Sequence, residues 1–253
     1  PNPLTIFQRL RVHCAGQLTE DLMYYSRVVA MQDHFVEPYK RIQLYGRSGF
    51  GFGTGNDANS VSASIPAGKT RKVTCPLLCG LTSQTSYIPL KFCPLLWELQ
   101  LQSDNSNCCV TDVAAGVSGS TEFTPSDCRI LCDMVTLDEL DEKVNKHLLS
   151  GKSLNLAMAS WNTTLNIVAP SDGFAVQIQR ALSRVKSVFV TFSDEAGDGN
   201  NVSQFLHPLK NQNYDPDKDT FQWYIQVGAQ RMPSFDVKSI SEAWYHLTKS
   251  LNM

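Results

Sequence analysis

Charge is scarce in this sequence, and neither sign is in clear excess. Only 18% of the 253 residues are charged, and 22 Lys and Arg stand against 24 Asp and Glu, for a formal net charge of −2 at pH 7. Proteins that bind nucleic acid over a broad surface usually carry a basic excess. The short basic clusters at 69–72 and 180–186 are more typical of solvated strand faces. We therefore predict no specific nucleic-acid contact.

Long apolar runs are also absent. No stretch approaches the roughly 20 apolar residues that a membrane span needs, and no basic segment followed by an apolar one opens the chain. We expect no membrane span and an intracellular setting. With 42% hydrophobic residues the chain can still bury a substantial core.

Eight cysteines are too few for a disulfide scaffold in a chain of this length. Four of them lie in apolar, strand-like runs, where we expect reduced thiols that act as small hydrophobes: Cys14, Cys75, Cys93 and Cys132. The pairs Cys75/Cys79 and Cys128/Cys132 share a C-x3-C spacing, but a C-x2-C zinc knuckle is missing. We predict no metal site.

Catalytic motifs are missing as well. There is no G-x-S-x-G elbow, and none of the five histidines has another three or four residues away. The acidic cluster 138–142 lies at a predicted helix start, where carboxylates are favoured by the helix dipole, and it lacks the glycine of a calcium loop. We predict no catalytic, cofactor-binding or metal residue and no cofactor, so the chain is not expected to be an enzyme. A hydrolase built on a β-sandwich remains an alternative interpretation, which the absence of a paired acid/base motif disfavours.

The segment "GRSGFGFGTGN" (46–56) is rich in glycine and raises the possibility of a phosphate-binding loop. Such a loop opens directly into a helix. Here the following residues are polar and β-branched without a helical period, and Asn56 stands where G-x-G-x-x-G needs its third glycine. We interpret the segment as a surface loop with Phe50 and Phe52 as aromatic anchors.

Strict alternation of apolar and polar residues predicts a mainly β protein. The clearest strands are "LLWELQLQS" and "TFQWYIQVG", which begin at residues 95 and 220. The same pattern predicts further strands at 4–16, 69–78, 87–92, 127–135, 153–168, 174–179 and 186–192.

Three helices are predicted from their start signals. Thr19, followed by two acidic residues, starts the first, and capping boxes start the others at Thr136 and Ser239. The second helix should run to Ser150 and stop at Gly151, with His147 near its carbonyl end. The apolar stripe of the last helix, which includes Trp244 and Leu247, indicates a packing face.

Several segments, taken in order, resemble the double jelly-roll major capsid proteins of tailless double-stranded DNA viruses, especially polinton-like viruses and virus-derived transposons. The adenovirus hexon belongs to the same lineage. The segments include "IPAGKTRKVTCPLLCGL" and "YIPLKFCPLLWELQLQSD", and the full set is 10–31, 65–81, 87–104, 131–156, 180–192 and 221–251. The glycine-rich loop at 46–56 departs from the family pattern.

The resemblance implies two jelly-roll β-sandwiches with three short capped helices. Two jelly rolls need about sixteen strands, whereas about ten are predicted, so we expect a middle portion of a longer protein. Residues 1–104 would form the later part of the first jelly roll, 105–126 a linker or surface loop, and 127–253 the earlier part of the second.

The function implied is that of a structural capsid protein. Subunits would form a homotrimer, a pseudo-hexagonal capsomer of an icosahedral virion shell, with penton and minor capsid proteins as further partners. The protein would be made inside the host cell. The alternative is a non-enzymatic binding module of the lectin or adhesin kind, in which Tyr39, Tyr45, Phe50 and Phe52 line a shallow sugar site.

Overall fold

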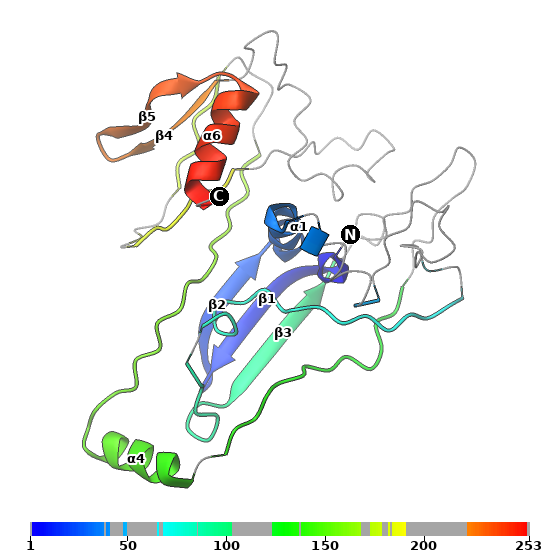
Figure 1. Cartoon of the computed structure of the whole chain (residues 1–253), viewed down its shortest axis with the longest axis vertical. Coiled ribbons are helices and arrows are strands. Elements are labelled where there is room, and N and C mark those ends of the chain that lie inside the picture. Colours follow the sequence, from blue (N-terminus) through cyan, green and yellow to red (C-terminus); the bar gives the residue numbers. More distant parts are fainter. Residues whose placement is uncertain are drawn as a thin grey trace. The chain divides into compact units, whose positions relative to one another are not determined.

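The structure is a computed structural model, and it falls into two compact units, Pro1–Ile167 and Val168–Met253, which we describe one at a time (Figure 1). The residues that it describes are 2–37, 39–40, 48–49, 65, 68–84, 86–102, 123–136, 138–167, 173–178, 182, 184–190 and 222–251. Most of the predicted linker 105–126 lies outside these ranges. Residues 127–167 group with the first unit, whereas the sequence-based division assigned them to the second. That division stays a prediction.

A three-stranded antiparallel sheet forms the centre of the first unit. Its strands are β1 (Phe7–Cys14), β2 (Gln17–Met23) and β3 (Leu95–Leu101), in the order β2-β1-β3. A two-residue turn joins β1 to β2, and both of its residues, Ala15 and Gly16, have positive φ, at 50° and 79°. Tight hairpin turns favour this conformation. The alternation that predicts β1 and β3 is confirmed.

The two faces of this sheet differ because side chains alternate along each strand. Leu10, Val12 and Leu22 are 0% exposed and form the core face. On the opposite face Arg9 of β1 and Asp21 of β2, which are diagonal neighbours across the two strands, form an ion pair. One face therefore packs and the other meets solvent.

Helix α1 (Tyr25–Phe35), the short 3-10 helix η1 (Pro3–Ile6) and residues 75–81 supply the rest of the core. In Figure 1 the segment that contains residues 75–81, drawn in cyan, crosses the sheet. Tyr25 is 0% exposed and lies in one cluster with Val29 and Leu81.

The prediction that a helix starts at Thr19 is wrong. Residues 17–23 form β2, and α1 begins only after Tyr24, which adopts the left-handed conformation (φ 53°, ψ 38°). The apolar residues of this stretch fit both the helical period of 3.6 and the strand period of two. Pairing of Glu20 with Val12 and of Leu22 with Leu10 gives the extended form its hydrogen bonds, so the strand period prevails.

The other two helices are confirmed. Helix α4 (Asp138–Leu149) ends where predicted, because Gly151 has a φ of 77° and its N–H donates to the Leu148 carbonyl at 3.0 Å. Helix α6 (Ile240–Leu251) begins with the predicted capping box, in which the Glu242 N–H donates to Ser239 Oγ at 3.2 Å. The capping hydrogen bonds of Thr136 stay a prediction.

The second unit contains a hairpin and α6. Strand β4 (Trp223–Val227), which the alternation predicts, pairs antiparallel with β5 (Gln230–Val237), which the sequence analysis missed. In this ribbon only Val237 is buried, at 0% exposure.

Several predicted strands are not strands in the described part of the chain. They fall at 69–78, 87–92, 127–135, 153–168, 174–179 and 186–192. Alternation selects residues suited to a half-buried strand, but a strand also needs a neighbour to accept its backbone hydrogen bonds. The described residues thus hold two small antiparallel sheets, three α-helices and long stretches without regular structure.

Candidate functional site

Among the described residues, Glu20 is the one charged residue that is buried. Glu20 is 2% exposed and lies on the core face of β2, two residues before the fully buried Leu22. Burying a carboxylate is costly unless hydrogen-bond donors compensate for the water that it loses. The hydrogen-bond donors around Glu20 therefore identify the segments that this carboxylate holds together.

Four hydrogen bonds from three residues reach the two carboxylate oxygens. The Gly80 N–H donates to both, at 3.0 and 2.9 Å, the Cys79 thiol donates to Oε2 at 3.1 Å, and the Ser160 hydroxyl donates to Oε1 at 3.0 Å. Among the described residues no Lys or Arg forms an ion pair with Glu20. We call Glu20, Cys79, Gly80 and Ser160 the Glu20 socket. It joins three segments that are far apart in sequence.

The turn at 79–83 presents Gly80 to this carboxylate. The Cys79 carbonyl accepts hydrogen bonds from the Ser83 N–H at 3.1 Å and from the Ser83 hydroxyl at 2.7 Å. A Cβ atom on Gly80 would lie 2.4 Å from the Ala159 carbonyl oxygen. Only glycine lets the segment around Ala159 approach so closely.

Residues 158–163 cover this turn. Ser160 binds Glu20, and the Thr163 hydroxyl donates to the Met23 carbonyl at the end of β2. Met158 and Trp161 pack against the core cluster. The attachments of the segment include two side-chain hydrogen bonds and two apolar contacts, and none of its described residues belongs to a strand.

Burial makes the phenol and the thiols of this region poor acids. It raises the pKa of Tyr25, whose hydroxyl accepts a hydrogen bond from the Leu78 N–H at 3.0 Å. Burial, followed by the hydrogen bond to Glu20, raises the pKa of Cys79 to about 11, and burial also raises that of Cys75. A thiolate is the reactive form of cysteine. At neutral pH Cys79 is therefore a hydrogen-bond donor rather than a nucleophile.

The outer face of the sheet carries ion pairs in place of a core. Arg9 makes a bidentate contact with Asp21, with N–O distances of 2.7 and 2.6 Å, and this hydrogen bonding raises the pKa of Arg9. Glu98 lies 3.2 Å from Arg11 and 3.6 Å from His13. The Arg11–Glu98 pair is exposed, and exposed pairs stabilise a fold only weakly. These charged side chains keep the outer face of the sheet in contact with solvent.

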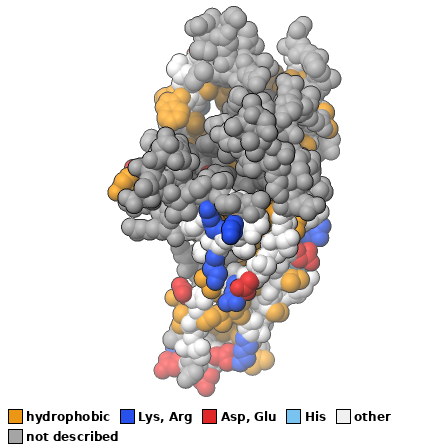
Figure 2. Space-filling view, turned by 90° about the vertical axis from the view of Figure 1, so that its right-hand side faces the viewer, with side chains coloured by type: hydrophobic (Ala, Val, Ile, Leu, Met, Phe, Trp, Pro, Cys, Tyr) orange, Lys and Arg blue, Asp and Glu red, His pale blue; other side chains and the backbone are white. Residues whose placement is uncertain are grey.

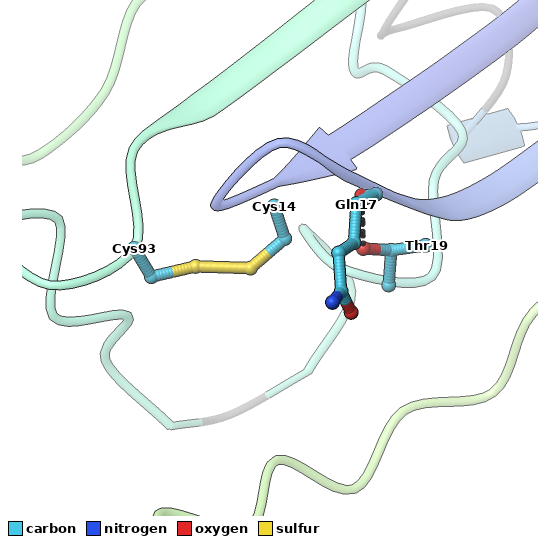
Figure 3. Close-up of a disulfide and its surroundings, with 4 residues drawn as sticks. All are labelled: Cys14, Gln17, Thr19 and Cys93. Atoms are coloured by element: carbon cyan, nitrogen blue, oxygen red, sulfur yellow. Dashed lines mark hydrogen bonds between the residues drawn. A yellow bond between two sulfur atoms is a disulfide. The ribbon is translucent and has the colours of Figure 1, made fainter.

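A disulfide joins Cys14 and Cys93, with the Cα atoms 5.7 Å apart (Figure 3). The expectation that these two residues are reduced thiols is therefore wrong. The pair closes the end of the sheet, where the Ala15 N–H also donates to the Pro94 carbonyl at 2.9 Å. The two cysteines are 79 residues apart in sequence, so no short spacing motif predicts that they form a disulfide.

The residues that the sequence analysis considered for chemistry do not converge. In the acidic cluster Asp141 pairs with Lys91 at 2.5 Å, and Glu139 pairs with Lys143 at 3.5 Å. Cys128 and Cys132 are exposed. Within the described ranges no group of three His, Cys, Asp or Glu side chains is placed to hold a metal ion.

Of the glycine-rich loop 46–56, only residues 48 and 49 lie within the described part. There the Ser48 carbonyl accepts a hydrogen bond from the Thr74 N–H at 3.0 Å. The two phenylalanines and Tyr45 fall outside it. Tyr39, the remaining aromatic residue of the alternative sugar site, is 66% exposed.

Sequence reasoning missed the Glu20 socket because it assigned Glu20 to a helix start. The signal was present, since the period of two that begins at Leu22 puts Glu20 on the same face. Saturated by neutral donors and closed to water, the carboxylate is suited to holding three segments together rather than to proton transfer.

Comparison with known proteins does not extend this picture. No family model matches the chain, and neither a curated protein nor a solved structure matches it. In the described part of the chain no helix has the length and apolar character of a membrane span.

Proposed function

We propose that the chain is part of a structural capsid protein of the double jelly-roll type. Three copies form a pseudo-hexagonal capsomer, capsomers tile the shell of a double-stranded DNA virus of the polinton-like kind, and penton and minor capsid proteins complete the shell. The proposal is supported by the sequence resemblance and by one feature of the described residues, which is a set of exposed apolar rows.

In these rows apolar residues alternate as they do in a strand, but their side chains are exposed instead of packed in a core. Phe174, Val176 and Ile178 alternate along one segment and are 52%, 43% and 50% exposed. Val188 and Val190 repeat the spacing, at 43% and 59%. Rows of apolar side chains left in water are unfavourable, and large exposed apolar surfaces commonly mark protein contacts. The rows are suited to being covered when copies of the protein assemble.

The polar surface of the first unit fits the same role. Figure 2 shows hydrophobic side chains in small groups among charged and polar ones, with acidic side chains gathered at the lower end, where Figure 1 places α4. Mixed surfaces of this kind are typical of contacts that form reversibly, which an assembling lattice needs in order to correct errors.

A charge placed in an exposed row tests the proposal. We expect Val176→Lys in the full-length protein to lower the fraction of trimer at least tenfold, because the lysine would be buried at the contact without a partner. The circular dichroism spectrum should not change. Trimer content is measured by light scattering.

Gln177→Lys is the matched control, because this substitution introduces the same charge at the residue next to Val176. It should leave the trimer intact. Equal loss of trimer in both variants would contradict a contact made by the apolar row. A wild-type protein that stays monomeric and binds a sugar on a glycan array would favour the lectin alternative.

A further inference from the structure

Residues 123–167 have the form of an arm that is anchored at few points. Along this arm α4 touches the body of the first unit through the exposed pair Lys91 and Asp141, and residues 158–163 occupy the Glu20 socket. On both sides of the socket contact the chain runs without regular structure. Figure 1 shows these two green limbs on either side of α4.

The flanks of the anchored segment expose apolar side chains. Leu131 is 82% exposed and Met134 71% before α4, and Leu165 is 46% exposed and Ile167 74% beyond the socket. Only the centre of the limb after α4 is embedded, through Met158 and Trp161. The arm therefore has a specific docking segment between stretches that a single chain leaves uncovered.

Chain length allows this segment to reach beyond its own subunit. Twenty-one residue steps separate Gln102, at the end of β3, from Phe123, where the arm begins. A fully extended chain spans at most about 3.3–3.6 Å per residue, or roughly 70 Å for this interval. Exchange of an identical element between copies keeps every contact of the socket and requires no new bonding pattern.

We propose that in the assembled protein the Glu20 socket of one copy receives residues 158–163 of a second copy. This inference rests on the proposed function, since it requires that copies assemble. The bound segment is recognised by three features: the close backbone approach of Ala159 to Gly80, the hydroxyl of Ser160 on the Glu20 carboxylate, and the hydroxyl of Thr163 on the Met23 carbonyl. Around a three-fold axis such an exchange closes into a ring.

Cross-linking between two single variants tests the exchange directly. One full-length chain carries Met23→Cys and is labelled with ¹⁵N; the other carries Thr163→Cys and is unlabelled. The two are expressed with different tags, co-assembled and oxidised, and the linked peptides are identified by mass spectrometry. A disulfide between residues 23 and 163 in this mixture can form only between copies.

The expected result is a hybrid peptide that joins residue 23 of one copy to residue 163 of the other, at least tenfold above a control mixture in which Asn166→Cys replaces Thr163→Cys. Adding Glu20→Gln to the Met23→Cys chain should lower its yield severalfold. The native Cys14–Cys93 peptide reports that oxidation is complete.

Three results would overturn the inference, and they differ in what they leave standing. If the protein assembles but the double variant Met23→Cys/Thr163→Cys links only within single chains, the exchange is wrong and the capsid proposal survives. If the protein remains monomeric, both fail. If neither the mixture nor the double variant cross-links, residues 158–163 do not occupy the socket at all.

Discussion

The central sheet of the first unit and the alternating segments of the second use the same sequence pattern with different degrees of burial. In the first, the alternating strands bury Leu10, Val12 and Leu22 completely. In the second, the alternating strand β4 leaves Val227 60% exposed, and the alternating segment 174–178 forms no strand. The pattern is equally clear in both. The difference lies in what stands next to each segment.

Neighbours decide whether an alternating segment becomes part of a core. The first unit has a third strand, a covering helix and the Glu20 socket, which draws residues 78–83 and 158–163 onto the sheet. Within the described residues the sheet β4-β5 has two strands, and a two-stranded sheet is marginal in water by itself. An exposed apolar row such as 174–178 is thus a strand pattern that is not paired into a sheet within the described residues.

Removing the disulfide should weaken the first unit most. Loop-closure entropy predicts a loss of about 4 kcal/mol for Cys93→Ser, because the bond joins residues 79 apart. Urea unfolding, followed by the fluorescence of Trp97 in β3, measures the change. Cys128→Ser, which alters an exposed free thiol, should have no effect. Equal stability of both variants would mean that Cys14 and Cys93 are not paired in solution.

Glu20→Gln should have the next largest effect, a loss of about 3 kcal/mol. The amide puts a donor where the Gly80 N–H, the Cys79 thiol or the Ser160 hydroxyl needs an acceptor, and buried donors left unpaired are costly. The control is Glu98→Gln on the wet face of the sheet, where the ion pair is exposed and should contribute less than about 1 kcal/mol. Equal losses of stability in the two variants would show that the hydrogen bonds of Glu20 contribute no more than an exposed ion pair.

A methyl group on Gly80 separates packing from charge in the same socket. Gly80→Ala keeps every donor and acceptor but places Cβ 2.4 Å from the Ala159 carbonyl oxygen, so we expect a loss of about 2 kcal/mol and release of residues 158–163. Hydrogen exchange of the amides from 158 to 163 measures the release. Gly173→Ala is the control, since nothing lies within 4 Å of its Cβ position. Unchanged exchange in Gly80→Ala would show that the close approach does not exist.

The smallest effect concerns the capping box of α6 in the second unit. Backbone hydrogen bonds from Lys238 and Ser239 lower the pKa of Glu242 below its ordinary value of 4.5. A lowered folded-state pKa stabilises the fold above the unfolded pKa, and this contribution is lost as the pH falls through the folded value. The amide shift of Lys238 should titrate with a midpoint below 4.5 and become flat in Glu242→Gln. A midpoint at or above 4.5 would show that the cap is not formed.

The sequence predicts local features of this protein better than tertiary ones. Capping residues and Gly151 locate two helices, because a helix end is decided by a few neighbouring residues. The first helix start was misplaced because Glu20 suits both a helix dipole and a strand paired with β1. The disulfide and the socket depend on contacts between residues 60 to 140 apart, which no local pattern encodes.

The solution mass of the full-length protein tests the central claim most directly. If exposed strand rows mark the contacts between copies, light scattering after gentle purification should give three times the subunit mass, and negative-stain images should show a pseudo-hexagonal outline. A monomer that persists at high protein concentration would contradict the claim, because the apolar rows would then have no copy to cover them.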